Sequence, residues 1–191
     1  MSISSTSPSQ APGQTAHALR TLYLVRAAFS VVWVGLVFLL ANSSPALTAA
    51  LLLVYPAWDV LATFGDLRAI RGTGETMLPQ YVNIVVGSLT TVAVGLALRE
   101  GIPAVLLVFG VWAVLTGLLQ LLLGLQRRRQ MGGQWPMILS GGQSVLAGAL
   151  FVVQAHDPTK GVTNVAAYSA VGAFYFLLAA LRLHKAIHST H

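Results

Sequence analysis

Arg26 and Asp59 are the residues of this chain best suited to chemistry, because each carries a charge inside an apolar segment. Residues 21–41 and 46–69, which contain them, are each long enough to cross a lipid bilayer. A charge at the bilayer centre costs roughly 2.5–3.5 kcal/mol on insertion scales, so it normally faces a partner, a cavity or water. The two charges are opposite and lie in consecutive segments. They could therefore form a structural ion pair, or they could belong to a pathway or a ligand site.

Helical spacing gathers further polar residues around these two charges. Asp59, Thr63 and Asp66 are spaced four and three residues apart, which places them on one face of a helix. At about 1.5 Å per residue, Arg26 lies roughly 9 Å from Arg20 along the helix axis, and its side chain is long enough to reach either carboxylate. We expect a buried polar site open toward the cytoplasm, made of Arg26, Asp59, Asp66, Asn83 and Gln143. The alternative is a set of separate interhelical hydrogen bonds, each worth about 0.6 kcal/mol.

Composition decides which solvent surrounds these segments. Hydrophobic residues make up 55% of the 191 residues and charged residues only 8%, whereas soluble domains carry about 25% charged residues. Too few charges remain to cover a soluble surface, so the lipid bilayer is the expected partner of most of the chain. The net charge of +6 comes from cations that flank apolar segments, which indicates membrane orientation rather than nucleic-acid binding.

Six apolar segments follow one another along the chain, and they must be helical because lipid cannot satisfy free backbone groups. The sequence therefore predicts an all-α integral membrane bundle within residues 20–185, with a disordered cytoplasmic tail at 1–19 and a cytoplasmic tail at 186–191. The expected spans are 21–41, 46–69, 79–98, 102–125, 135–153 and 162–183.

The distribution of Lys and Arg predicts how the chain is oriented. Arg99 and Lys160 lie on one side of the membrane, where Glu100 and Asp157 offset them. The other side carries eight cations: Arg20, Arg68, Arg71, Arg127, Arg128, Arg129, Arg182 and Lys185. The positive-inside rule puts that side, and both termini, in the cytoplasm.

The six segments also form three repeats of a helical hairpin. Each hairpin has a short turn followed by a proline that fits the first turn of the next helix, namely Pro45, Pro103 and Pro158. Each hairpin then ends in cations, which begin at Arg68, Arg127 and Arg182 respectively.

Three apolar, Gly-rich hairpins with these prolines and basic ends resemble the HdeD-like family of small bacterial inner-membrane proteins. The resemblance implies six spans, a bacterial inner-membrane location and, for the named member of that family, a role in acid-stress resistance. It implies no catalytic residues.

Small residues predict how the helices pack, because close backbone approach holds apolar helices together in lipid. Gly110, Gly117 and Gly124 recur every seven residues and mark one continuous seam. Gly87 and Gly95 mark a second face, and Gly148 belongs to a third. These faces suit packing within one chain, while a homo-oligomer stays possible.

Several kinds of active site are missing from the sequence. It has no Cys, no Gly-rich phosphate loop, no paired-His metal motif and no nucleophile elbow. We therefore expect no metal, no cofactor and no enzymatic activity. Two functions stay open: a non-enzymatic inner-membrane protein linked to acid or envelope stress, as the resemblance implies, or a small transporter or channel that uses Arg26 and Asp59. The small molecule or ion that such a protein would take is not named by the sequence.

Overall fold

The computed structural model describes residues 12–41, 43–74, 76–131 and 134–188. Over this part of the chain all regular secondary structure is helical, and all six helices are long and apolar enough to cross a membrane. The prediction of a six-helix membrane bundle is confirmed. The helices are α1 (Pro12–Leu40), α2 (Pro45–Ile70), α3 (Leu78–Ala97), α4 (Ile102–Met131), α5 (Trp135–Gln154) and α6 (Val162–His188).

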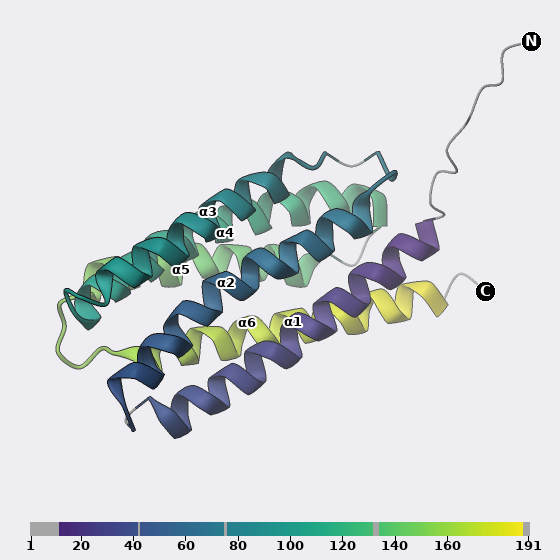
Figure 1. The fold of residues 1–191 in the computed structure, drawn as a ribbon. Helices are drawn as coiled ribbons and strands as arrows, with labels where there is room; N and C mark the ends of the chain where they lie inside the picture. The colour runs from purple at the N-terminus through teal and green to yellow at the C-terminus, as the bar shows by residue number, and fades with distance from the viewer. Residues whose placement is uncertain (1–11, 42, 75, 132–133, 189–191) are drawn as a thin grey trace, which may run out of the picture.

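The helices run up and down and close into a ring, because α6 packs along α1 (Figure 1). The most extensive contacts join α4 to α5, α1 to α6 and α2 to α3. Each predicted hairpin therefore packs more closely against its neighbours than its own two helices pack against each other. Arg68 of α2 and Arg128 and Arg129 of α4 lie in the last turns of their helices, at the end of the ring where α1 begins and α6 ends. We call this end of the ring the basic end.

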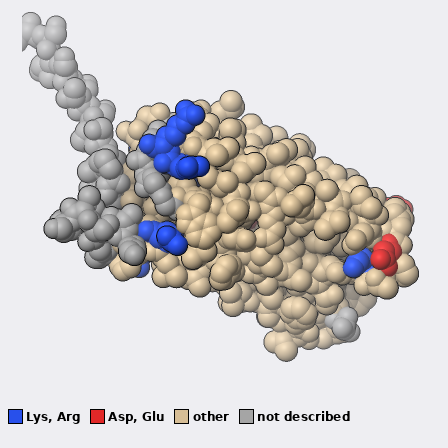
Figure 2. Space-filling view, turned by 180° about the vertical axis from the view of Figure 1, so that it is seen from behind, with Lys and Arg blue, Asp and Glu red and all other residues tan. Residues whose placement is uncertain are grey.

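Charged side chains lie at the two ends of the bundle, separated by a wide uncharged belt (Figure 2). The belt consists of exposed apolar side chains such as Val31, Leu61 and Leu89, each more than 60% exposed. Outward-facing apolar side chains at this density suit a lipid surface.

The first helix is longer than the sequence predicted. Residues 12–19, expected to belong to a disordered tail, form the first two turns of α1. The reason is packing, because Leu19 is fully buried in a cluster with Ala179 and Leu183 of α6. At the other terminus α6 runs to His188, so residues 186–188 of the predicted tail are also helical. The remaining tail residues, 1–11 and 189–191, lie outside the described part of the chain.

The three turns between paired helices are built differently. Ser44 caps α2 by accepting a hydrogen bond from the Ala46 amide at 3.2 Å, and Pro45 is the first helical residue, as predicted. The prediction for Pro158 was wrong, because α6 begins four residues later. There Asp157 Oδ1 accepts hydrogen bonds from the amide and hydroxyl of Thr159, at 2.9 and 2.7 Å, which holds the chain in a non-helical turn.

Glycines allow α4 and α5 to approach backbone to backbone. A Cβ at Gly117 would lie 2.8 Å from the Gly141 carbonyl oxygen, and one at Gly110 would lie 2.8 Å from that of Gly148. The predicted α4 glycines thus all face α5, with Gly124 against Ile138. Gly87 meets Val60 of α2 in the same way, at 2.6 Å, whereas the space at Gly95 is ordinary, with its nearest neighbour at 3.7 Å.

An apolar layer crosses the half of the ring away from the basic end. Its largest fully buried members are Trp33 and Phe109, both at most 2% exposed, and Trp33 donates a hydrogen bond to the Leu51 carbonyl at 2.8 Å. Residues of α1, α2, α3, α4 and α6 meet in this layer, which also includes Val37, Leu52, Val94, Val105, Leu106, Val165 and Ala166. In the half of the ring nearer the basic end, polar and charged side chains face the interior instead.

Candidate functional site

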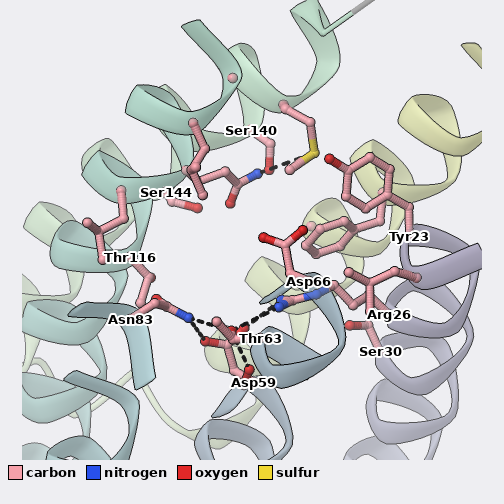
Figure 3. A pocket seen from close by; sticks show the side chains of 18 of the residues that line it. Tyr23, Arg26, Ser30, Asp59, Thr63, Asp66, Asn83, Thr116, Ser140 and Ser144 are labelled. Carbon is pink, nitrogen blue, oxygen red and sulfur yellow. Dashed lines mark hydrogen bonds and ion pairs between the residues drawn. The ribbon is translucent and has the colours of Figure 1, made fainter. Parts of the chain in front are cut away.

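A cavity of about 120 Å³ lies inside the ring, and all six helices line it (Figure 3). By volume it has room for several water molecules. Its lining mixes charged, amide, hydroxyl and aromatic side chains, and examples from the six helices in order are Arg26, Asp59, Asn83, Gln120, Ser140 and Tyr168. The cavity occupies the half of the ring between the apolar layer and the basic end.

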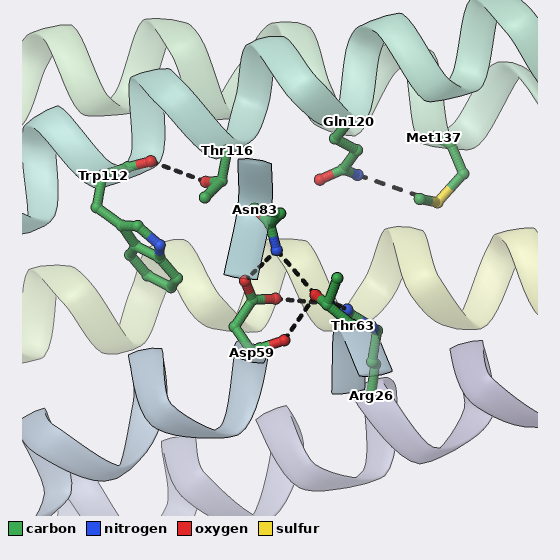
Figure 4. Close-up of polar contacts among 8 residues, drawn as sticks. All are labelled: Arg26, Asp59, Thr63, Asn83, Trp112, Thr116, Gln120 and Met137. Carbon is green, nitrogen blue, oxygen red and sulfur yellow. Dashed lines mark hydrogen bonds and ion pairs between the residues drawn. The ribbon is translucent and has the colours of Figure 1, made fainter. Parts of the chain in front are cut away.

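The inner cluster consists of Arg26, Asp59, Thr63 and Asn83 (Figure 4). Arg26 Nη1 lies 2.6 Å from Asp59 Oδ1, and Asn83 Nδ2 donates to Asp59 Oδ2 at 2.8 Å. Thr63 donates its hydroxyl proton to the Asp59 carbonyl oxygen, so its oxygen accepts from Arg26 and Asn83. The Arg26 guanidinium also stands 5.4 Å from the centre of the Phe176 ring. This charge pair is thus held by α1, α2, α3 and α6 together.

The outer cluster consists of Tyr23, Asp66, Gln80 and Arg127, and it lies nearer the basic end. Arg127 Nη2 is 2.9 Å from Asp66 Oδ1, while Gln80 Nε2 donates to Asp66 Oδ2 at 3.0 Å. Arg127 Nη1 donates to the Tyr23 hydroxyl at 3.2 Å. Asp66 follows Asp59 by seven residues on α2, which separates the two clusters by roughly 10 Å along the helix axis.

The two clusters repeat one design, in which a carboxylate of α2 binds an arginine through one oxygen and a carboxamide of α3 through the other. They differ in burial. The side chains of Arg127 and Asp66 are 4% and 9% exposed, whereas those of Arg26 and Asp59 are 15% and 17% exposed. Because the inner pair lines the cavity, the cavity is the surface that its exposed atoms face.

Aromatic and hydroxyl groups form the rest of the wall. Trp58 stacks on Phe29 with ring centroids 4.4 Å apart, and Trp112 meets Tyr55 edge-on at 5.7 Å. Between α5 and α6, the Tyr168 hydroxyl donates to Ser144 Oγ at 2.8 Å. The cavity therefore offers flat apolar surfaces beside neutral hydrogen-bonding groups.

The structure brings together some of the residues proposed from the sequence and separates others. Arg26, Asp59 and Asn83 meet in the inner cluster, and Asp66 belongs to the outer one. Gln143 does not line the cavity, because α5 turns Ser140 and Ser144 toward it instead. Gln143 is the neighbour of Ser144, so its side chain points about 100° away from that of Ser144 around the helix axis.

Two members of the outer cluster were not recognised from the sequence. Arg127 was read as part of a basic run that marks topology, and Gln80 was not considered. The signal for Arg127 was spacing: Gln120, Gly124 and Arg127 lie four and three residues apart, and all three line the cavity. Among the described residues, no three His, Asp or Glu side chains gather in a way that could hold a metal ion.

Comparison with known proteins gives a partial match. Residues 81–153 match the family model described as a short repeat of unknown function (DUF308), which is the family of HdeD-like membrane proteins. The matched region runs from α3 to the end of α5 and so includes the glycine seam between α4 and α5. No curated protein and no solved structure matches the chain.

Proposed function

We propose that this protein is a non-enzymatic, multi-pass protein of the bacterial inner membrane that carries a small polar solute through its central cavity. The observation that supports this proposal is the cavity itself, to which all six helices contribute and which contains a charge pair at membrane depth. Intramembrane charges of this kind commonly mark substrate pathways. In the proposed orientation both termini and the basic end face the cytoplasm, as the positive-inside rule requires.

The apolar layer favours a carrier over an open channel. A channel needs a continuous polar path, whereas large apolar side chains such as Trp33 and Phe109 interrupt the path beyond the cavity. A solute would therefore reach the cavity from the basic end and leave on the other side only after the helices rearrange. The pairing of neighbouring repeats across the ring gives such a rearrangement natural boundaries.

An enzymatic role has less support. Asp59 and Asp66 are the cavity's two carboxylates among the described residues, and each is held by an arginine and a carboxamide. At roughly 10 Å apart along α2 they are too distant to share a proton as a catalytic dyad.

The transport proposal is tested with the purified chain in liposomes. Stopped-flow light scattering would follow the influx of urea, glycerol and potassium chloride after an osmotic step. The wild type is expected to accelerate at least one solute over empty liposomes. Asp59→Asn should abolish that acceleration, because Asn keeps the shape of Asp59 but leaves the Arg26 charge without its partner.

The matched control is Asp157→Asn, which removes a carboxylate from a turn far from the cavity and should behave as the wild type. Folding of each variant is checked by circular dichroism and by its elution on size-exclusion chromatography. If the folded wild type accelerates none of the solutes, the carrier proposal is refuted.

A second candidate, a role in acid or envelope stress, is supported by the family match at residues 81–153. It predicts that a strain lacking the gene survives acid challenge less well and that the wild-type gene restores survival. Equal survival of the two strains would remove this candidate.

A further inference from the structure

We propose that the central cavity selects a small uncharged solute that both donates and accepts hydrogen bonds, and that it excludes ions. This inference rests on the proposed solute-carrying function and names the class of solute. It follows from three features of the cavity: how its charges are paired, which polar atoms are left over, and how much room it has.

The charges that line the cavity are already compensated. Each carboxylate has an arginine on one oxygen and a carboxamide on the other, so both oxygens of Asp59 and Asp66 are engaged. The two arginines have equally specific partners, with Arg26 against Thr63 and Phe176 and Arg127 against Tyr23. An ion that entered would lose its hydration shell without gaining a free counter-charge, which is costly in a low-dielectric site.

The polar atoms that remain are neutral. Four buried atoms of residues that line the cavity find no hydrogen-bond partner among the described residues: Trp58 Nε1, Trp112 Nε1, Gln80 Oε1 and Gln134 Oε1. Of these residues, Trp112 is 5% exposed, Gln80 1% and Gln134 2%. The Gln80 orientation is fixed chemically, because the Asp66 carboxylate only accepts and so must receive the amide N–H, which leaves the Gln80 oxygen free.

A buried donor or acceptor without a partner is costly, so a solute that supplies a partner is bound more tightly than one that does not. The indole N–H groups need acceptors, and the two amide oxygens need donors. Trp112 lies fifteen residues, and so roughly 22 Å along α4, from Arg127, whose partner Asp66 holds Gln80. A small solute that passes along the cavity therefore meets unpaired donors in one part and unpaired acceptors in another, and it must carry both kinds of group to pair with each. Hydroxyl and amide compounds do so, whereas simple anions and metal cations do not.

The size of the cavity limits the solute to a few non-hydrogen atoms. Its volume of about 120 Å³ is below the roughly 300–1,000 Å³ of pockets that hold drug-sized ligands. Trp58, Tyr55 and Phe176 supply apolar surface for a short carbon skeleton. Gly172 lines the cavity with nothing within 4 Å of an added Cβ, so this wall has space that a larger side chain would fill.

The test is quenching of tryptophan fluorescence by three small probes: acrylamide, which is an uncharged amide, iodide and caesium. The protein has four tryptophans, of which Trp58 and Trp112 line the cavity. Trp135 is 39% exposed, so the measurements use the full chain with Trp135→Phe. Trp33, at 2% exposed in the apolar layer, then provides an internal unquenched component.

We expect acrylamide to quench most of the fluorescence, and iodide and caesium to quench little of it. Gly172→Phe should reduce acrylamide quenching at least several-fold by filling the cavity. Gly142→Phe is the matched control, because an added Cβ there also meets nothing within 4 Å but the residue lies outside the cavity. It should leave quenching unchanged.

The outcomes separate this inference from the carrier proposal. Quenching by iodide or caesium that matches acrylamide, and that Gly172→Phe removes, would overturn the uncharged class while leaving a solute cavity in place. Acrylamide quenching that Gly172→Phe leaves unaltered would also overturn the inference, since the probe would not be using the cavity. Absence of quenching by all three probes would overturn both proposals.

Discussion

Replacing Arg127 by Leu should destabilise the protein far more than the same change at its neighbours Arg128 and Arg129. The three arginines are consecutive and look equivalent in the sequence. In the structure Arg127 is 3% exposed and paired with Asp66, whereas Arg128 and Arg129 are exposed. The perturbation therefore compares a buried ion pair with two surface charges in the same helical turn.

The expected magnitude follows from what Arg127→Leu leaves behind. The Asp66 carboxylate, 9% exposed, would keep only its hydrogen bond from Gln80. Removing one partner of a buried pair costs about 3–5 kcal/mol, because the other charge stays buried without compensation. Arg128→Leu should change the free energy of unfolding by less than about 0.5 kcal/mol, as exposed substitutions usually do.

The double variant Asp66→Leu/Arg127→Leu isolates the pair itself. Both charges are then gone and apolar side chains fill the space, which is often neutral or stabilising relative to a buried pair. We expect the double variant to be markedly more stable than Arg127→Leu alone, with a coupling energy of at least about 2 kcal/mol between the two sites.

The assay is reversible unfolding by sodium dodecyl sulfate in mixed micelles, followed by circular dichroism, for the wild type, Arg127→Leu, Arg128→Leu, Asp66→Leu and the double variant. Equal free energies of unfolding for Arg127→Leu and Arg128→Leu would refute the reasoning. So would a double variant no more stable than Arg127→Leu, since the buried unpaired carboxylate would then not be the cause.

Three further predictions concern packing, water access and pH. Gly117→Leu should lose most of its folded yield, because its Cβ would meet Ser144 Cβ at 2.7 Å and the Gly141 carbonyl at 2.8 Å. Gly142→Leu should keep its yield, because an added Cβ there meets open space. Equal yields of detergent-solubilised protein for the two variants would count against the α4–α5 seam. Because the chain has no cysteine, single cysteines can report access to water. Thr116→Cys, at the cavity, should react with a membrane-impermeant thiol reagent added from the basic end, whereas Ser88→Cys, on the outer surface of α3, should not. A mass shift from labelling at both sites, or at neither, would contradict the prediction that water enters the cavity from the basic end. The Thr159 hydroxyl and amide, with Lys160 nearby, lower the pKa of Asp157. The contribution of Asp157 to stability is therefore present above its unfolded pKa and is lost as pH falls through the lower folded pKa. Thr159→Val should raise the Asp157 pKa toward its usual range in a carboxyl NMR titration, and an unmoved pKa would show that the hydroxyl is not the cause.

The sequence predicted the helices because bilayer thickness and backbone chemistry leave little choice. Apolar runs of about twenty residues must be helical in lipid, and the expected span 135–153 differs from α5 by one residue. Boundaries failed where they depend on neighbours. The start of α1 at Pro12 reflects burial of Leu19 against α6, which no local pattern shows. Pro158 lies outside α6 because the Asp157 carboxylate fixes a turn at Thr159.

The candidate site likewise combines features that the sequence determines with features that only helix packing decides. Charge cost alone required that Arg26 and Asp59 have partners, and helical spacing put Asp59, Thr63 and Asp66 on one face, so these residues follow from the sequence by itself. Which partner each charge takes was decided by the closure of the ring, which brings Arg127 of α4 to Asp66 of α2 and leaves Arg26 to Asp59. The same closure turned Ser144 rather than Gln143 inward and left a cavity with a polar lining between the helices. Sequence spacing fixes angles around one helix axis, whereas a cavity depends on the relative positions of six axes, and only tertiary packing sets those.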